Sequence, residues 1–216
     1  MGKPGGGGRR ARQNAAVTTA GAAPPGLPAE STRARVERAA LDLFTLRGFE
    51  RVTSDEVADA AGISRRTFFR YFATKADAVW GDFAGHVARL EALLAGSDPA
   101  QPVMASVCAA YVEVNSYPES QLHLLRERMQ LILTEPALLA HSQLRFAEVD
   151  RAVARYVAAR TGGTAQELLP RLVAASTRAA ATTAFEAWLA DERSSLVAQL
   201  RLALDELARG FPALDD

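Results

Sequence analysis

Apolar residues recur at helical spacing along most of the chain after residue 30. Four of them have the spacing of one buried helix face and predict a first helix: Val36, Ala40, Leu43 and Phe44. Beyond Lys75, Pro and Gly residues divide the sequence into further predicted helices at about 75–95, 102–115, 118–133, 136–161, 165–190 and 194–209. No segment has the alternation typical of a strand, so the pattern predicts an all-α protein.

The segment from Val52 to Phe83 carries the signals of two short helices joined by a tight turn. Thr53 and Glu56 form the Thr-x-x-Glu pattern of a capping box, in which each side chain bonds a free backbone amide at a helix start. Gly62 stands where the chain needs a residue free to adopt positive φ, and Ser64 can cap the next helix. This spacing is that of a helix-turn-helix.

The second of these helices, SRRTFFRYF, indicates the function. If Phe68 and Phe72 face the core, the exposed arc holds Arg65, Arg66, Thr67, Phe69, Arg70 and Tyr71. Arginine can bond guanine O6 and N7 in a major groove, and hydroxyl groups reach phosphates. Thr74 begins a second capping pattern, which puts Lys75 near a helix N-terminus, where a phosphate can be held. We therefore favour DNA binding over a basic helix that is merely exposed to solvent.

The distribution of charge adds to this picture. The formal net charge is zero, but residues 1–75 contain 13 Lys and Arg against 7 Asp and Glu, and residues 76–216 contain 12 against 18. Residues 1–29 have almost no large apolar side chains, so we expect a disordered basic arm that either touches DNA or is a plain tail. The predicted organisation is this arm, a helix-turn-helix domain at 30–75 and a second domain at 76–216.

Gly62 to Phe72 reads GISRRTFFRYF, and Lys75 follows three residues later. This stretch closely resembles the DNA-binding domain of the TetR family of bacterial transcription regulators. The resemblance implies an N-terminal three-helix DNA-binding domain and a C-terminal helical bundle that binds ligand and dimerises. It implies phosphate contacts from Thr53, Ser54, Thr67, Tyr71 and Lys75, with Arg65, Arg66 and Arg70 as base-reading candidates. Phe69 replaces a frequent tyrosine, so we expect an apolar contact there.

Two longer stretches narrow the resemblance. RRTFFRYFATKADAVWGDF and RERMQLILTEPALLAHSQLRFAE are similar to the mycofactocin-system regulators and their acyl-CoA-responsive relatives. This implies a homodimeric repressor that binds a pseudo-palindromic double-stranded operator and is released by a long-chain acyl-CoA. Small residues in the alanine-rich run at 174–181 allow close packing, so this helix and the last one are expected to form the dimer interface.

Apolar side chains of the second domain are candidates for lining an effector pocket. They are Met104, Cys108, Leu125, Met129, Ile132, Leu133, Phe146, Phe185 and Trp188. Methionine is an adaptable lining for a flexible chain, although ordinary core is the commoner role for each of these residues. Arg126, Arg128 and Arg145 lie on the same segments and are candidates for an anionic head group, with solvated surface as the alternative.

Other function classes have little support. His86, His123 and His141 have neither metal-ligand spacing nor a nucleophile motif, so we expect no enzyme, metal or cofactor. No apolar run is long enough to span a bilayer, and the single cysteine suits a reducing compartment, so we expect a cytoplasmic protein without a membrane partner. The remaining alternatives are a TetR-type regulator of another small apolar effector and a helical ligand carrier that does not bind DNA.

Overall fold

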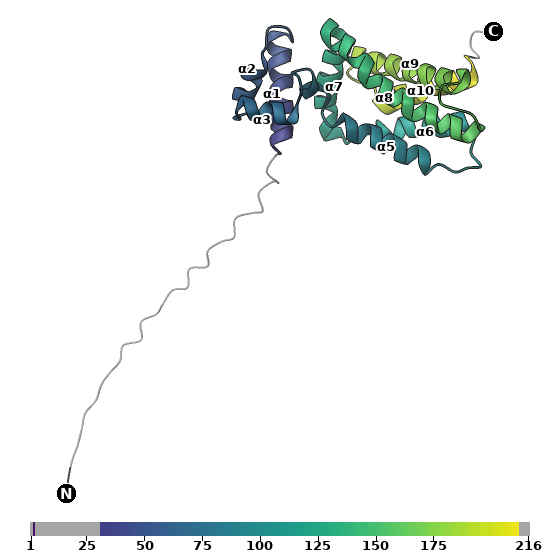
Figure 1. Cartoon of the computed structure of the whole chain (residues 1–216), viewed down its shortest axis with the longest axis horizontal. Coiled ribbons are helices and arrows are strands. Elements are labelled where there is room, and N and C mark those ends of the chain that lie inside the picture. Colours follow the sequence, from purple (N-terminus) through teal and green to yellow (C-terminus); the bar gives the residue numbers. More distant parts are fainter. Residues whose placement is uncertain (1, 3–30, 212–216) are drawn as a thin grey trace. The chain divides into compact units, whose positions relative to one another are not determined.

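The computed structural model describes Gly2 and residues 31–211, so the predicted basic arm at 1–29 lies, apart from Gly2, outside the described residues. The described part is all-helical, which confirms the predicted fold class (Figure 1). Its ten helices are α1 (Thr32–Arg47), α2 (Ser54–Ala60), α3 (Arg65–Tyr71), α4 (Asp77–Trp80), α5 (Phe83–Ala95), α6 (Val103–Val114), α7 (Glu119–Thr134), α8 (Pro136–Thr161), α9 (Leu168–Ala190) and α10 (Leu196–Arg209).

Helices α1, α2 and α3 form the predicted helix-turn-helix group. The capping box at the start of α2 is complete, with both the Thr53 and the Glu56 side chains bonded to backbone amides. Gly62 has φ of +66°, and the Ser64 hydroxyl accepts a hydrogen bond from the Thr67 amide at 3.1 Å. Phe68 is fully buried, so α3 is fixed through its apolar face while its other face stays exposed.

The single helix predicted at 75–95 is wrong, because the chain breaks it into α4 and α5. Gly81 follows Trp80 with φ of 64° and ψ of −144°, a conformation essentially restricted to glycine. Asp82 then caps α5 by accepting a hydrogen bond from the Gly85 amide at 3.1 Å. The break turns the chain between two buried aromatic residues, Trp80 and Phe83.

Helices α5 to α10 form the bundle (Figure 1). Within it α9 packs against α8 and α10, α5 packs against α6 and α8, and α7 packs against α8 and α9. The longest helix, α8, starts at Pro136 and ends before the left-handed Gly162, as the turn signals predicted. In the described part of the chain, no helix combines the length and the apolar character needed to cross a membrane.

Helix α1 connects the helix-turn-helix group to the rest of the fold. It packs against α2 on one side and against α4 and α7 elsewhere along its length. Its buried face includes Val36, Ala40, Leu41 and Phe44, each at most 1% exposed. Packed contacts therefore run from α4 and α7 through α1 and α2 to α3.

Replacing Gly81 with alanine should destabilise the protein for two reasons. The backbone conformation would cost about 1–3 kcal/mol with a side chain, and the new Cβ would lie 2.6 Å from Nη1 of Arg128. Gly162→Ala is a control for positive φ alone, since Gly162 has the left-handed conformation with φ of +76° and nothing lies within 4 Å of the added Cβ. Urea denaturation should show a larger loss for Gly81→Ala; equal losses would contradict the contact with Arg128.

Candidate functional site

The exposed face of α3 carries most of the predicted DNA-contacting side chains. Those with clear solvent exposure are Arg65, Arg66, Phe69, Arg70 and Tyr71, and Thr67 is half-buried beside them. Phe69 is 43% exposed although it packs edge to face on Phe68, with ring centroids 5.3 Å apart. A large aromatic side chain at the centre of a basic face is available for contact with a partner molecule.

The three arginines of α3 differ in the contacts that they form within the protein. Arg65 is paired with Asp55 of α2 at 2.7 Å, and the Arg70 guanidinium lies 5.0 Å from the centre of the Tyr71 ring. Arg66 is exposed and has no hydrogen bond or ion pair within the described part of the chain. Arg66 is therefore the arginine whose donors can turn to a base edge without breaking an existing contact.

Two of the hydroxyl groups predicted to contact phosphate, those of Thr53 and Thr67, already form hydrogen bonds at helix starts. The Thr53 hydroxyl donates to Oε2 of Glu56 at 2.9 Å, and the Thr67 and Ser64 hydroxyl oxygens are 2.9 Å apart. Hydrogen bonds from the Thr53 backbone and from Arg47 lower the pKa of Glu56 to about 2, so the box keeps its charge at neutral pH. A phosphate only accepts, so Thr53 can donate to one only by leaving Glu56. Ser54, the first residue of α2, is half-buried.

Lys75 holds the turn between α1 and α2. Its ammonium donates to the carbonyl oxygens of Phe49 at 2.7 Å, Val52 at 2.9 Å and Glu50 at 3.4 Å, and lies 4.3 Å from the centre of the Phe49 ring. The three donors of the ammonium thus have protein acceptors. This structural contact differs from the phosphate site that the sequence suggested, because the ammonium points back to the preceding turn.

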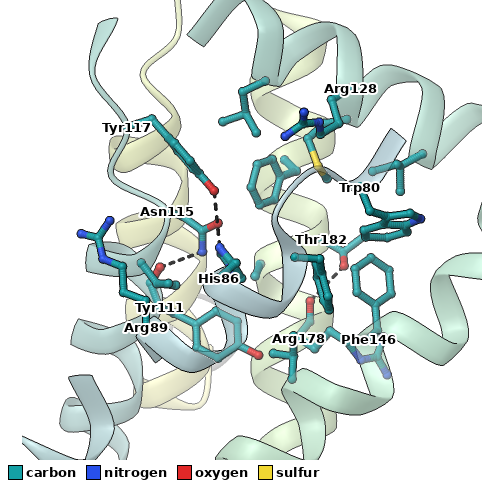
Figure 2. A pocket seen from close by; sticks show the side chains of 18 of the residues that line it. Trp80, His86, Arg89, Tyr111, Asn115, Tyr117, Arg128, Phe146, Arg178 and Thr182 are labelled. Carbon is teal, nitrogen blue, oxygen red and sulfur yellow. Dashed lines mark hydrogen bonds between the residues drawn. The ribbon is translucent and has the colours of Figure 1, made fainter. Parts of the chain in front are cut away.

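A cavity of about 340 Å³ lies inside the bundle, mostly lined by apolar and aromatic groups (Figure 2). Five predicted pocket residues line it: Leu125, Met129, Ile132, Phe146 and Phe185. Among the lining residues that sequence reasoning missed are Trp80, Phe83, His86, Tyr111, Asn115 and Tyr117. The first three come from the α4–α5 break, which the Gly81-Asp82 pair could have signalled as a turn followed by a helix cap.

The other five predicted pocket residues do not line this cavity. Met104 and Leu133 are half-buried, and Cys108 lies against α10, where burial raises the pKa of its thiol to about 11. Arg145 donates to Asp77 at 2.7 Å, and the Trp188 ring packs against Arg126 at 4.1 Å. Arg126 itself donates to the Trp188 carbonyl oxygen, so it caps the C-terminal end of α9.

Several polar side chains lie among the residues that line the cavity. Trp80 Nε1, Tyr111 OH and Arg128 Nε are buried and have no partner among the residues that the structure describes. Leaving such a donor unsatisfied costs about 1–3 kcal/mol. Burial also lowers the pKa of His86, whose Nδ1 lies 3.4 Å from the Tyr117 hydroxyl. The mostly apolar lining with a few polar side chains therefore suits a largely apolar ligand.

Three arginines line the cavity, and each has a carboxylate partner. Arg178 donates from Nε to both oxygens of Asp150 at 3.0 Å, and Arg89 pairs with Glu113 at 3.1 Å. Arg128 reaches out of the bundle to Glu37 of α1 with a longer separation of 3.4 Å. Among these three arginines, Arg128 is therefore the one that is paired with α1 of the helix-turn-helix group.

Glu37 is shared between two arginines. Its Oε1 accepts from Arg33 Nε at 3.0 Å while its Oε2 faces Arg128, and Arg33 also donates to the Gly81 carbonyl oxygen at 3.0 Å. Burial raises the pKa of Glu37 despite both neighbouring cations, and burial also lowers the pKa of Arg128. Both directions mean that the desolvation of these groups outweighs their attraction.

Comparisons with known proteins agree with this geometry. Residues 38–78 match the family model described as bacterial regulatory proteins of the tetR family, and residues 101–212 match the model described as the MftR C-terminal domain. The chain is 37% identical over 185 residues to the mycofactocin biosynthesis transcriptional regulator MftR of Mycobacterium tuberculosis, covering 86% of this chain and 93% of the relative.

Solved structures share the fold at lower identity. A TetR-family transcriptional regulator from Syntrophomonas wolfei superposes with a TM-score of 0.60 at 14% identity, covering 81% of this chain and 91% of that one. The Thermus thermophilus repressor FadR, in complex with lauroyl-CoA, superposes with a TM-score of 0.50 at 23% identity, covering 82% and 94%. These two matches support the arrangement of helices.

Replacing Lys75 with methionine should lower the free energy of unfolding. The change removes hydrogen bonds from a charged donor to buried carbonyls, for which we expect a loss of about 1.5–3 kcal/mol. Arg66→Met is the control, because an exposed side chain without internal contacts should change stability by less than about 0.5 kcal/mol. Urea denaturation measures the free energy of unfolding of both variants. A wild-type value for Lys75→Met would show that the Lys75 hydrogen bonds do not contribute to stability.

Proposed function

The chain belongs to the TetR family of bacterial regulatory proteins, and we propose that it is a repressor that binds a pseudo-palindromic operator as a homodimer and is released by a long-chain acyl-CoA. The exposed basic face of α3 carries this proposal. Arg66 there has no competing contact in the described part of the chain, and it lies beside Arg70 and the exposed Phe69. Such a face provides donors for base edges and an apolar surface for a thymine methyl.

A homodimer would supply the second recognition helix. In one chain, Leu168 and Leu172 of α9 and Leu202 of α10 are 80%, 57% and 58% exposed. Leu168 and Leu172 also border a groove of about 660 Å³ between α8 and α9. Exposed apolar side chains of this size suit burial against a second copy. Two copies of α3 spaced about 34–36 Å apart could then read successive major grooves.

The cavity supports an effector with a flexible apolar chain. Its volume of about 340 Å³ is at the lower end of small-molecule sites, which span roughly 300–1,000 Å³. An acyl chain suits that space and the adaptable side chain of Met129, whereas the nucleotide part of an acyl-CoA would have to lie outside it. The relative FadR was solved with lauroyl-CoA, which makes this ligand class the first to test.

A second candidate function is a TetR-type regulator of another small apolar effector. The small volume of the cavity favours it, because a compact ligand would fill the space without any part remaining outside. In both cases ligand binding must favour a domain arrangement that binds operator less tightly.

Replacing Arg66 with alanine should weaken binding to the operator more than binding to random DNA. If Arg66 reads a base, the specific loss should be about 1–3 kcal/mol, while the fold is unaffected because the side chain is exposed. Gel shifts with duplexes from the DNA flanking the gene and with random duplexes measure both affinities. Equal losses on both would exclude base reading by Arg66, and no shift by the wild type would favour the helical carrier.

Long-chain acyl-CoA should release the operator complex at micromolar concentration. We expect palmitoyl-CoA to do so, and free coenzyme A to have no effect because it cannot fill the apolar cavity. Phe185→Trp, which enlarges a side chain that lines the cavity, should weaken the response and leave operator affinity unchanged. Release by an unrelated apolar compound, with no response to any acyl-CoA, would support the second candidate.

A further inference from the structure

Polar contacts connect the cavity to α1 of the helix-turn-helix group. Arg128, which lines the cavity, contacts Glu37 of α1. Glu37 also accepts from Arg33 of α1, which donates to the Gly81 carbonyl oxygen. We propose that Arg128 binds an anionic group of the ligand, a carboxylate or a phosphate, and that it gives up Glu37 of α1 in doing so. The exchange selects anionic ligands and transmits their binding to α1. This inference rests on the proposed function, because it describes how the effector of the same cavity acts.

Arg128 has the geometry for this exchange. It lies on α7, lines the cavity and keeps a buried Nε without a partner in the described part of the chain. The absent side chain of Gly81 leaves room for the guanidinium, since an added Cβ there would be 2.6 Å from Nη1. Figure 2 shows the Arg128 side chain among those that border the cavity. One guanidinium therefore has access to the ligand and to Glu37.

The other arginines of the bundle are held more firmly. Arg178 donates to both oxygens of Asp150 at 3.0 Å, and Arg145 donates to Asp77 at 2.7 Å. Arg126 is bonded to the end of α9 and does not line the cavity. Arg128 contacts its carboxylate at 3.4 Å, and that carboxylate has Arg33 as a second cation at 3.0 Å. Redirecting Arg128 thus leaves Glu37 with a partner, whereas redirecting Arg178 would leave Asp150 without an ion pair among the described residues.

The exchange would reach DNA binding through α1. Helix α1 packs against α4 and α7, and Glu37 is its ion-pair contact to the cavity-lining Arg128. Burial already outweighs the attraction between these two groups, as the raised pKa of Glu37 and the lowered pKa of Arg128 indicate. A ligand anion that attracts Arg128 weakens the contact between α7 and α1. By linkage, weakening that contact from the α1 side must strengthen binding of an anionic ligand.

The test replaces Glu37, which does not line the cavity, with glutamine. Isothermal titration calorimetry on the full chain without DNA would compare decanoate, decanoyl-CoA and uncharged 1-decanol. We expect Glu37→Gln to bind the anionic probes about tenfold more tightly and to bind 1-decanol as the wild type does. Asp42→Asn is the matched control, because it removes one negative charge from an exposed position of the same helix and should change nothing.

A second variant tests the cation. Arg128→Gln should bind decanoate or decanoyl-CoA about tenfold more weakly and keep its affinity for 1-decanol, while Arg89→Gln, at another lining arginine, should keep the anion preference. If decanoate shows the effect, the anion is a carboxylate in the cavity; if only decanoyl-CoA shows it, the anion is a phosphate. If Arg128→Gln does not fold, the Glu37→Gln comparison still decides.

Two results would overturn the inference. One is Glu37→Gln behaving like Asp42→Asn towards both anionic probes, and the other is wild-type protein binding neither anionic probe more tightly than 1-decanol. Either result leaves the proposed function standing if long-chain acyl-CoA still releases the operator. Conversely, loss of operator binding would refute the proposed function without altering the calorimetric comparison, which contains no DNA.

Discussion

The break between α4 and α5 at Gly81 is the constraint on which both the cavity and its link to α1 depend. With φ of 64° and ψ of −144°, this position is open to glycine and costly for other residues. It puts Trp80 and Phe83 on either side of a turn, where their rings meet at 5.2 Å and both line the cavity. Its carbonyl oxygen accepts from Arg33, and its missing side chain makes room for Arg128.

Ion pairs in this fold differ in how far the attraction between the charges offsets the cost of burying them. Arg178 donates one Nε–H to both oxygens of Asp150 at 3.0 Å, and it is the one cation paired with that carboxylate among the described residues. Glu37 instead divides its two oxygens between Arg33 and Arg128, and burial dominates its pKa. A contact in which burial outweighs attraction is one with which an anionic ligand can compete.

Signals within a few residues of one another made the helix-turn-helix predictable. The Thr53–Glu56 box, the positive φ of Gly62 and the Ser64 cap all depend on spacings of three residues or fewer from a helix end, and all three are present. The bounds of α8 followed from Pro136 and Gly162 in the same way. The α4–α5 break was missed because apolar periodicity continues across it, although a glycine-aspartate pair is itself a turn signal.

The cavity was only partly predictable, since periodicity shows that a helix face is buried and leaves open which neighbour covers it. Leu125 and Met129 face the cavity, whereas Cys108 of the nearby α6 faces α10. Charged side chains depend still more on distant partners: Lys75 bonds Phe49, 26 residues earlier, and Arg128 meets Glu37, 91 residues earlier. Contacts that join a DNA-binding part to a ligand-binding part are necessarily of this long-range kind. The coupling between the two parts is therefore the feature of such a regulator that local sequence patterns reveal least.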